Sequence, residues 1–298
     1  MPRYPYVAMP PHTMSRRQFV CLGASCLLPS LSHAADSLQI VYPRAESQTD
    51  ERSLYPLQLL QLALNKSGVA FHLQPSNTQM PQNSAMLQLA SGQDITVVWS
   101  MTSKQREQDL LAIRIPLDKG LLGWRLLLIR QKDQDKFNRI KQAADLQKLS
   151  AVQGHDWPDT DILRANGFRV EGNPHYEFLF TMLEKGVVDY FPRSVLEIWD
   201  EEKKHPNMGL AIEQNLILQY PTAMYFFVRK NNTALATLLE NGLQTALKDG
   251  SFDQLFMRFY SDIMQRANLK GRTRISLHNP LLPAATPLQQ KELWLNFS

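Results

Sequence analysis

Strand-like and helix-like segments alternate along this chain, and that alternation limits the fold more than any other feature of the sequence. Residues 38–43 are mostly apolar and end at a proline, which is typical of a short strand. Leu57, Leu60 and Leu64 then recur at helical spacing, and the order strand, helix, strand continues through residues 69–100. Because helical crossovers of one hand join parallel strands, this order predicts an α/β fold with mostly parallel sheets flanked by helices.

A second alternating run starts near Gly120. Its short apolar segments predict strands, with helices predicted between them at residues 143–150, 159–168 and 176–186, and two amphipathic helices follow the last strand. The strands are predicted at residues 124–131, 150–154 and 187–194, and the two helices at residues 234–250 and 251–264. The Pro-rich stretch 279–287 cannot continue a helix and is expected to lie extended on the surface. The length of 298 residues suffices for one large domain or two medium ones.

The first residues have the composition of an export signal. Arg16 and Arg17 precede an apolar run over residues 19–31, and small residues suited to cleavage follow at 32–34. A membrane-spanning helix needs ~20 apolar residues, and Pro29 interrupts this run well before that length. The pattern therefore indicates a cleaved signal peptide rather than a membrane span.

The paired arginines indicate a particular export route. Residues 15–20, "SRRQFV", closely resemble the twin-arginine signal of bacteria. We expect residues 1–35 to be this signal and the protein to be periplasmic, with membrane contact only during export. A buried N-terminal helix, a lipid anchor at Cys26 and a start at Met14 are the alternatives. Cys21 also lies in the leader, so the mature chain would have no disulfide, thiolate metal site or cysteine nucleophile.

Charge and motifs exclude several classes of function. The net charge of +4 includes three arginines of residues 1–35, and the rest carries 29 basic against 28 acidic residues. Such a balance gives no basic face, so no nucleic-acid partner is expected. Nucleophile elbow, P-loop, dinucleotide-binding and zincin motifs are absent from the sequence. We expect no catalytic activity, no cofactor and no metal, although His155, Asp156, Asp159 and Asp161 form a polar cluster that offers the metal-binding alternative.

Three segments carry a resemblance to a known family. They are "DITVVWSMTSKQRE" at 94–107, "LEKGVVDYFPRS" at 183–194 and "LENGLQTALKDGSFDQLFMRF" at 239–259. In this order behind an export signal, the chain resembles the family 3 extracellular solute-binding proteins of the amino-acid type over residues 38–259. The resemblance implies two α/β lobes joined by two crossing strands, with a small-molecule ligand trapped between them by hinge closure.

The resemblance also implies boundaries and partners. Lobe 1 is expected at residues 36–119 and 225–271, lobe 2 at 120–224 and an extended C-terminal tail at 272–298, with hinges near 120–123 and 220–223. A monomer of this family would deliver its solute to an ABC permease. A membrane sensor as partner, a small dehydratase-like enzyme on the same fold and a purely structural protein are the alternatives. An acid such as Glu46 or Asp159 in the cleft would be the mark of the enzyme.

In lobe 1 the resemblance singles out Ser100 and Arg106. One strand of the family corresponds to residues 95–100 of this chain. In the loop after that strand, the family presents a hydroxyl or backbone group and then an arginine to the ligand carboxylate. Ser100 matches the first position, and Arg106 stands one residue beyond the second. The planar arginine fork pairs with both oxygens of a carboxylate, although Arg106 as a solvated loop residue is the alternative. Tyr42 lies at the end of the first predicted strand, where open α/β sheets place ligands, and could stack on the ligand; a solvated loop is the alternative there. Trp157 of lobe 2 is a second candidate ring, and ordinary packing is its alternative.

In lobe 2 the candidates are Thr160 and Arg193. In the segment that corresponds to residues 154–163, the family places small polar residues at the start of a helix. Thr160 matches one of these positions, whereas Asp159 is more simply interpreted as a helix cap. Arg193 stands where amino-acid binders of the family hold the ligand ammonium with an aspartate. An arginine repels a cation and attracts an anion, so the sequence predicts an anionic solute. A surface salt bridge from Arg193 to Glu197 or Asp200 is the alternative.

Overall fold

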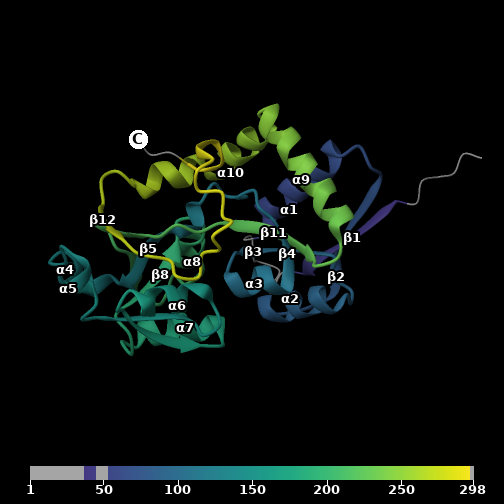
Figure 1. Cartoon of the computed structure of the whole chain (residues 1–298). Coiled ribbons are helices and arrows are strands. Elements are labelled where there is room, and N and C mark those ends of the chain that lie inside the picture. The colour runs from purple at the N-terminus through teal and green to yellow at the C-terminus, as the bar shows by residue number, and fades with distance from the viewer. Residues whose placement is uncertain (1–36, 45–52, 296–298) are drawn as a thin grey trace, which may run out of the picture. The chain divides into compact units, whose positions relative to one another are not determined.

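The computed structural model describes residues 37–44 and 53–295 (Figure 1). The predicted signal peptide, both cysteines and Glu46 lie outside the described residues, so the export route stays a prediction. In the part of the chain that is described, no helix has the length and apolar character needed to cross a membrane.

Lobe 1 is built on two groups of strands that lie side by side. Its strands are β1 (Leu38–Arg44), β2 (Phe71–Gln79), β3 (Val97–Met101), β4 (Leu110–Ile113) and β11 (Met224–Arg229), and its helices are α1 (Leu54–Lys66), α2 (Gln82–Ser91), α3 (Lys104–Asp109) and α9 (Thr233–Lys248). β1 pairs with β2, and β3, β11 and β4 form a second sheet in that order. Thr96 joins the two sheets, because its N–H donates to the Val41 carbonyl at 2.9 Å and its Oγ1 accepts from the Val41 N–H at 2.8 Å.

Helix α1 shows how the sequence pattern produces this packing. Leu59, Leu60, Ala63 and Leu64 are fully buried along one face, as their helical spacing requires. The chain then turns at Gly68, whose φ of 72° lies in the left-handed region that glycine adopts readily. α1 packs closely on α9, where a Cβ on Gly242 would lie 2.0 Å from the Ala63 carbonyl oxygen. That close approach accounts for a glycine inside α9.

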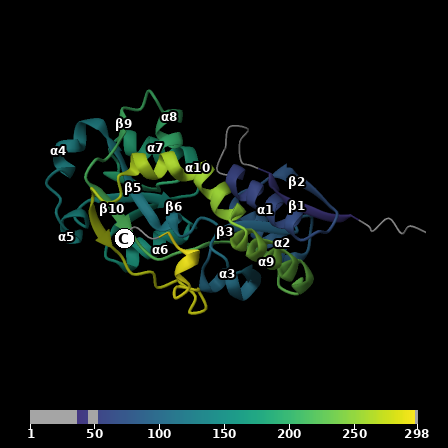
Figure 2. The same cartoon turned by 90° about the horizontal axis from the view of Figure 1, so that it is seen from above.

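Lobe 2 is built on one seven-stranded sheet. Its strands are β5 (Trp124–Arg130), β6 (Ser150–Gly154), β7 (Arg169–Asn173), β8 (Tyr190–Ser194), β9 (Leu210–Ile212), β10 (Leu216–Gln219) and β12 (Thr273–Ser276), and its helices are α4 (Gln134–Phe137), α5 (Ala143–Leu146), α6 (Pro158–Ala165), α7 (Tyr176–Glu184) and α8 (Ile198–Lys204). The order is β12-β10-β5-β8-β6-β7, with β9 beside β5. Residues 126–129 of β5 are fully buried, which explains their continuous apolar sequence. Helix α10 (Ser251–Ala267) precedes β12 (Figure 2).

Strand directions distinguish β5 and β11, which follow the two crossings between lobes, from the other strands. The pairs β1–β2, β6–β7 and β6–β8 are parallel, as βαβ connections require, and the pair β10–β12 is parallel as well. Each antiparallel pair in the described chain includes β5 or β11, the strands that follow the two crossings. The predicted two-lobe α/β fold with helix-flanked sheets is confirmed, while the residues chosen as lobe boundaries stay a prediction.

The two crossing segments are tied to each other by backbone hydrogen bonds. Tyr220 donates its N–H to the Gly123 carbonyl at 3.1 Å, and Leu117 donates to the Met224 carbonyl at 2.9 Å. Asp118 is fully buried between them and accepts from the Leu122 N–H at 2.6 Å and the Gly120 N–H at 3.2 Å. A carboxyl group therefore fixes the turn at the first crossing.

We expect Asp118 to make the protein less stable as pH rises from 4 to 7. Burial raises the pKa of Asp118 from 3.8 to about 6, although hydrogen bonds from Leu122 and Gly120 act to lower it. A raised folded-state pKa contributes stability below the unfolded value and loses it as pH rises through the folded value, a change of about 3 kcal/mol here. Urea unfolding across this range should show a smaller decline for Asp118→Asn than for the wild type.

The exposed Asp161→Asn variant is the control and should follow the wild-type curve. Parallel curves for wild type and Asp118→Asn between pH 4 and 7 would contradict the prediction.

Candidate functional site

Arg106 is a buried cation at the end of lobe 1. It lies on α3, a helix that the sequence analysis did not predict, and Ser103 begins that helix by accepting the Arg106 N–H at 3.2 Å. The Arg106 Nη1 donates to Ser100 Oγ at 2.8 Å and to the Met101 carbonyl at 2.7 Å. Its Nη2 donates to Gln82 Oε1 at 2.9 Å, and only 9% of the residue is exposed. The structure thus brings Ser100 and Arg106 together and excludes the solvated alternative.

The guanidinium keeps its charge and part of its hydrogen-bonding capacity. Burial lowers the pKa of Arg106 to about 10, and Asp156 and Asp159 act to raise it, so the group is protonated at neutral pH. A guanidinium has five N–H donors, and three of them serve Ser100, Met101 and Gln82. The Nε–H and one Nη2–H make no hydrogen bond to the residues described. Nε and Nη2 form one edge of the guanidinium, and such an edge can pair with both oxygens of a carboxylate.

The side chains of Asp159 and Thr160 on α6 interact with other residues of the protein. The Thr160 hydroxyl donates to the Gly154 carbonyl at 2.6 Å and is fully buried. Asp159 is buried beside it, pairs with Arg125 at 2.7 Å and accepts from the Tyr220 hydroxyl. Within the described chain, no group of three or more histidine, cysteine or acidic side chains is arranged to hold a metal ion.

Arg193 is buried and surrounded by carboxylates. Its Nε and Nη2 donate to the two oxygens of Glu201 at 2.7 and 2.5 Å, and Nη2 lies 3.0 Å from Glu197. The guanidinium carbon lies 4.8 Å from the Trp157 ring centroid and 4.9 Å from that of Phe191. Burial works to lower the pKa of Arg193, but Glu197 and Glu201 outweigh it and hold the pKa well above its ordinary value.

The same network extends to Arg125, so two guanidinium groups face three carboxylates. Arg125 pairs with Asp159 at 2.7 Å and lies 3.7 Å from Glu197. The alternative of a salt bridge to Glu197 is observed, but it is buried, and Glu201 takes the place expected for the exposed Asp200. Lobe 2 therefore presents no surplus positive charge around Arg193, and the role of Arg193 in ligand binding stays a prediction.

Residues of the two lobes meet close to Arg106. Asn83, next to Gln82 at the start of α2, donates its side-chain amide to Asp156 at 2.6 Å, and Asp156 lies in the turn before α6. Tyr42 lies at the end of β1, with its ring centroid 6.0 Å from that of Trp99. Burial raises the pKa of Tyr42, and Arg44 acts to lower it. Gln82 and Asn83 were missed by the sequence analysis, and their only signal was a polar pair after Pro81 at a helix start.

Solved structures with the same arrangement of elements exist. No protein-family model and no curated protein matches the sequence. An ancestral arginine-binding protein bound to arginine is 18% identical, with a TM-score of 0.56 over 75% of this chain and 98% of its own. A histidine kinase sensor domain with similarity to periplasmic binding proteins is 13% identical, with a TM-score of 0.55 over 75% of this chain and 96% of its own. The GluR0 ligand-binding core from Nostoc punctiforme, in complex with L-glutamate, is 12% identical, with a TM-score of 0.53 over 75% and 99%.

This chain has the type II periplasmic-binding-protein fold. The match accounts for two lobes whose sheets are linked by crossing segments at residues 118–123 and 220–223. The neighbours are matched over nearly their whole length, whereas this chain is matched over three quarters of its own. This chain therefore has residues in addition to those that match the neighbours.

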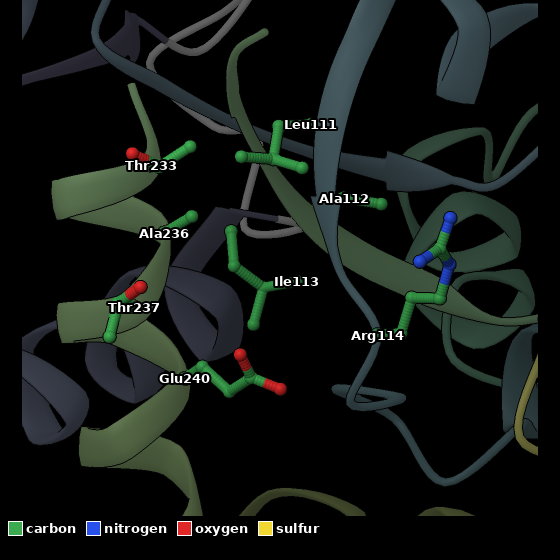
Figure 3. Close-up of a pocket in the computed structure, with 8 residues that line it drawn as sticks. All are labelled: Leu111, Ala112, Ile113, Arg114, Thr233, Ala236, Thr237 and Glu240. Carbon is green, nitrogen blue, oxygen red and sulfur yellow. The ribbon is translucent and has the colours of Figure 1, made fainter. Parts of the chain in front are cut away.

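One pocket of the periplasmic-binding-protein fold lies on lobe 1 alone, between strand β4 and helix α9 (Figure 3). It has a volume of about 260 Å³. It is lined by Leu111, Ala112, Ile113, Arg114, Thr233, Ala236, Thr237 and Glu240. None of the five predicted site residues lines it. Its walls are mostly aliphatic side chains and threonines, with Arg114 and Glu240 as the charged residues of the lining.

Proposed function

We propose that this chain is an extracytoplasmic solute-binding protein that captures a small carboxylate-bearing anion between its two lobes and has no catalytic activity. The observation that carries the proposal is Arg106, a buried guanidinium with two N–H donors, at Nε and Nη2, that no described residue accepts. Burying a charge in a protein interior costs free energy unless the charge is paired and hydrogen-bonded. A ligand carboxylate would complete the hydrogen bonding of the fork.

The surroundings of Arg106 support a carboxylate as the bound group. Ser100 and Met101 accept from Nη1 and Gln82 accepts from Nη2, and the Nε–H makes no hydrogen bond to a described residue. Each hydrogen bond between such charged groups contributes ~1.5–3 kcal/mol. Tyr42 and Trp157, one from each lobe, are the aromatic side chains that we assign to the rest of the ligand.

The lobe 2 network supports a ligand without an α-ammonium group. Arg193 occupies the position at which the amino-acid binders of the resembled family carry an aspartate. Its carboxylate partners Glu197 and Glu201 are already engaged by guanidinium groups. Lobe 2 would then recognise the ligand through shape and the Trp157 ring, and charge recognition would rest on lobe 1.

Hinge closure is the mechanism that the fold supports. Asn83 of lobe 1 and Asp156 of lobe 2 make a direct hydrogen bond at 2.6 Å next to the residues that hold Arg106. We assign this pair to the closed state, in which the two lobes exclude water from the bound solute. Release to an ABC permease would require the pair to separate.

A periplasmic location and a permease partner complete the proposal. Structures with this fold include an arginine-binding protein and a histidine kinase sensor domain, so delivery to a membrane sensor is the second candidate. Co-purification of the mature, tagged protein with membrane fractions, followed by identification of the bound component, separates a permease from a sensor.

A thermal-shift screen of residues 36–298 tests the function. Dicarboxylates, monocarboxylates without an amine, neutral and cationic amino acids, sugars and phosphate esters form the panel. A ligand at 100 times its Kd stabilises the protein by ~2.7 kcal/mol, which shifts the midpoint by several degrees. We expect an amine-free carboxylate to give the largest shift. A larger shift with cationic amino acids would overturn the anionic assignment, and no shift with any compound would overturn solute binding.

A further inference from the structure

The C-terminal segment runs from lobe 2 to lobe 1 across the two crossing segments (Figures 1 and 2). It begins at β12 on the edge of the lobe 2 sheet, passes the second crossing and ends against the first. The sequence predicts only an extended surface tail for this segment. The contacts of residues 273–295 with both lobes suggest a mechanical role.

Its first part is fastened to lobe 2. Strand β12 pairs in parallel with β10, and the Leu277 N–H continues this pairing to the Gln219 carbonyl at 2.8 Å. Asn166, at the end of α6, then binds His278 twice. Its Oδ1 accepts the His278 N–H at 2.9 Å, and its Nδ2 donates to the His278 carbonyl at 2.6 Å. The chain is thus held on lobe 2 up to residue 278.

Its middle part is fastened to the second crossing and then to lobe 1. Asn279 is 4% exposed and donates its side-chain amide to the Pro221 carbonyl at 2.9 Å. The Leu281 carbonyl accepts the N–H of Lys104 at 3.0 Å, and the Lys104 Nζ donates to the Pro280 carbonyl at 2.8 Å. Lys104 is the first residue of α3, the helix that carries Arg106.

Its last part is fastened to the first crossing. The Leu295 N–H donates to the Lys119 carbonyl at 2.9 Å, and Lys119 Nζ donates to the Glu292 carbonyl at 3.3 Å. The Trp294 ring covers Gly120, where a Cβ would lie 2.7 Å from the ring. Glycine at position 120 therefore provides both the φ of 81° and the space for this ring.

We propose that residues 277–295 form a strap that limits how far the two lobes open and that holds the start of α3 in place. The length of the chain between two anchors sets the limit. His278 is bound to lobe 2 and Leu281 to lobe 1, so three residue steps join the lobes at this edge. Three extended residues span at most ~10 Å. Wider opening would have to break the contacts at Asn166 or at Lys104.

Lengthening the strap while keeping its anchors tests the proposal. A Gly-Ser-Gly-Ser insertion between Asn279 and Pro280 adds up to ~13 Å of reach to the segment that joins the lobes. The same insertion between the exposed Ala284 and Ala285 is the matched control, because it lies beyond the Leu281 anchor. Neither insertion removes a residue of β12 or Trp294. Thermal unfolding of both variants checks separately that they fold.

Residues 36–298 contain no cysteine, so two introduced cysteines can be labelled selectively. Leu87 on α2 is 71% exposed and Val187 of lobe 2 is 62% exposed, which makes them suitable label sites. Spin-label distances are measured in protein without ligand, so the result does not depend on the proposed solute. We expect the first insertion to lengthen and broaden the Leu87–Val187 distance, and the control to match the parent.

Unchanged distances in the Asn279/Pro280 insertion would overturn the strap. Equal lengthening in both insertions would also overturn it, because the anchors at His278 and Leu281 would then not be the limiting pair. A failed ligand screen leaves these distances unaffected, so the strap and the proposed function can fail independently.

Discussion

The Glu201→Ala variant is expected to lose about 3–5 kcal/mol in free energy of unfolding. Glu201 holds both Nε and Nη2 of Arg193, and the two residues are 4% and 2% exposed. Removing the carboxylate leaves a buried guanidinium with Glu197 as its remaining charged partner. Urea unfolding at pH 7 measures the loss.

Asp200→Ala is the control for this variant, because Asp200 lies on the same helix and is exposed. A double variant, Arg193→Met with Glu201→Leu, should recover most of the loss, since removing both members of a buried pair leaves no orphaned charge. Equal losses for Glu201→Ala and Asp200→Ala would contradict the role assigned to the pair.

The Arg106→Ala variant is expected to lower affinity for the solute found in the screen by more than 100-fold. Two charge-assisted hydrogen bonds at ~1.5–3 kcal/mol each account for an effect of this size. Arg106→Lys should restore little of it, because an ammonium group cannot reproduce the two parallel donors of the fork. Isothermal titration of wild type and variants gives the affinities.

Arg229→Ala controls for the loss of one positive charge from lobe 1, because Arg229 is exposed at the end of β11. The unfolding midpoint of each variant without ligand is recorded as well, since Arg106 also binds Ser100, Met101 and Gln82. Wild-type affinity in a folded Arg106→Ala variant would remove Arg106 from the site.

The fold could be predicted largely because periodic hydrophobicity marks its elements. The leucines of α1 and the apolar residues 126–129 of β5 form the buried faces that their spacing indicated. Short elements were missed where no such pattern exists. Helix α3 has the sequence KQREQD, and α8 has IWDEEKK, in which charged residues outnumber apolar ones.

Individual residues of the candidate site could be chosen from the sequence, but their interactions could not be predicted. Arg106 and Ser100 were singled out and do bind each other. Arg193 was singled out too, but its main partner Glu201 was hidden in the acidic run 200–202 because the local sequence does not show which carboxylate turns inward. Asp159 shows the same limit, since its partners Arg125 and Tyr220 are distant in the chain and only the tertiary fold brings them to it.

The position of β11 between β3 and β4 has a consequence for how the protein is made. Phe226 of β11 pairs with Trp99 on one side and with Ile113 on the other, so the middle strand of the sheet is synthesised after the whole of residues 114–223. The sheet cannot close while the ribosome is still producing those residues. Pairings so distant in sequence fold slowly, because a long loop must close before they contribute stability. A chain exported in the folded state, as the predicted twin-arginine signal implies, must complete its synthesis before it leaves the cytoplasm.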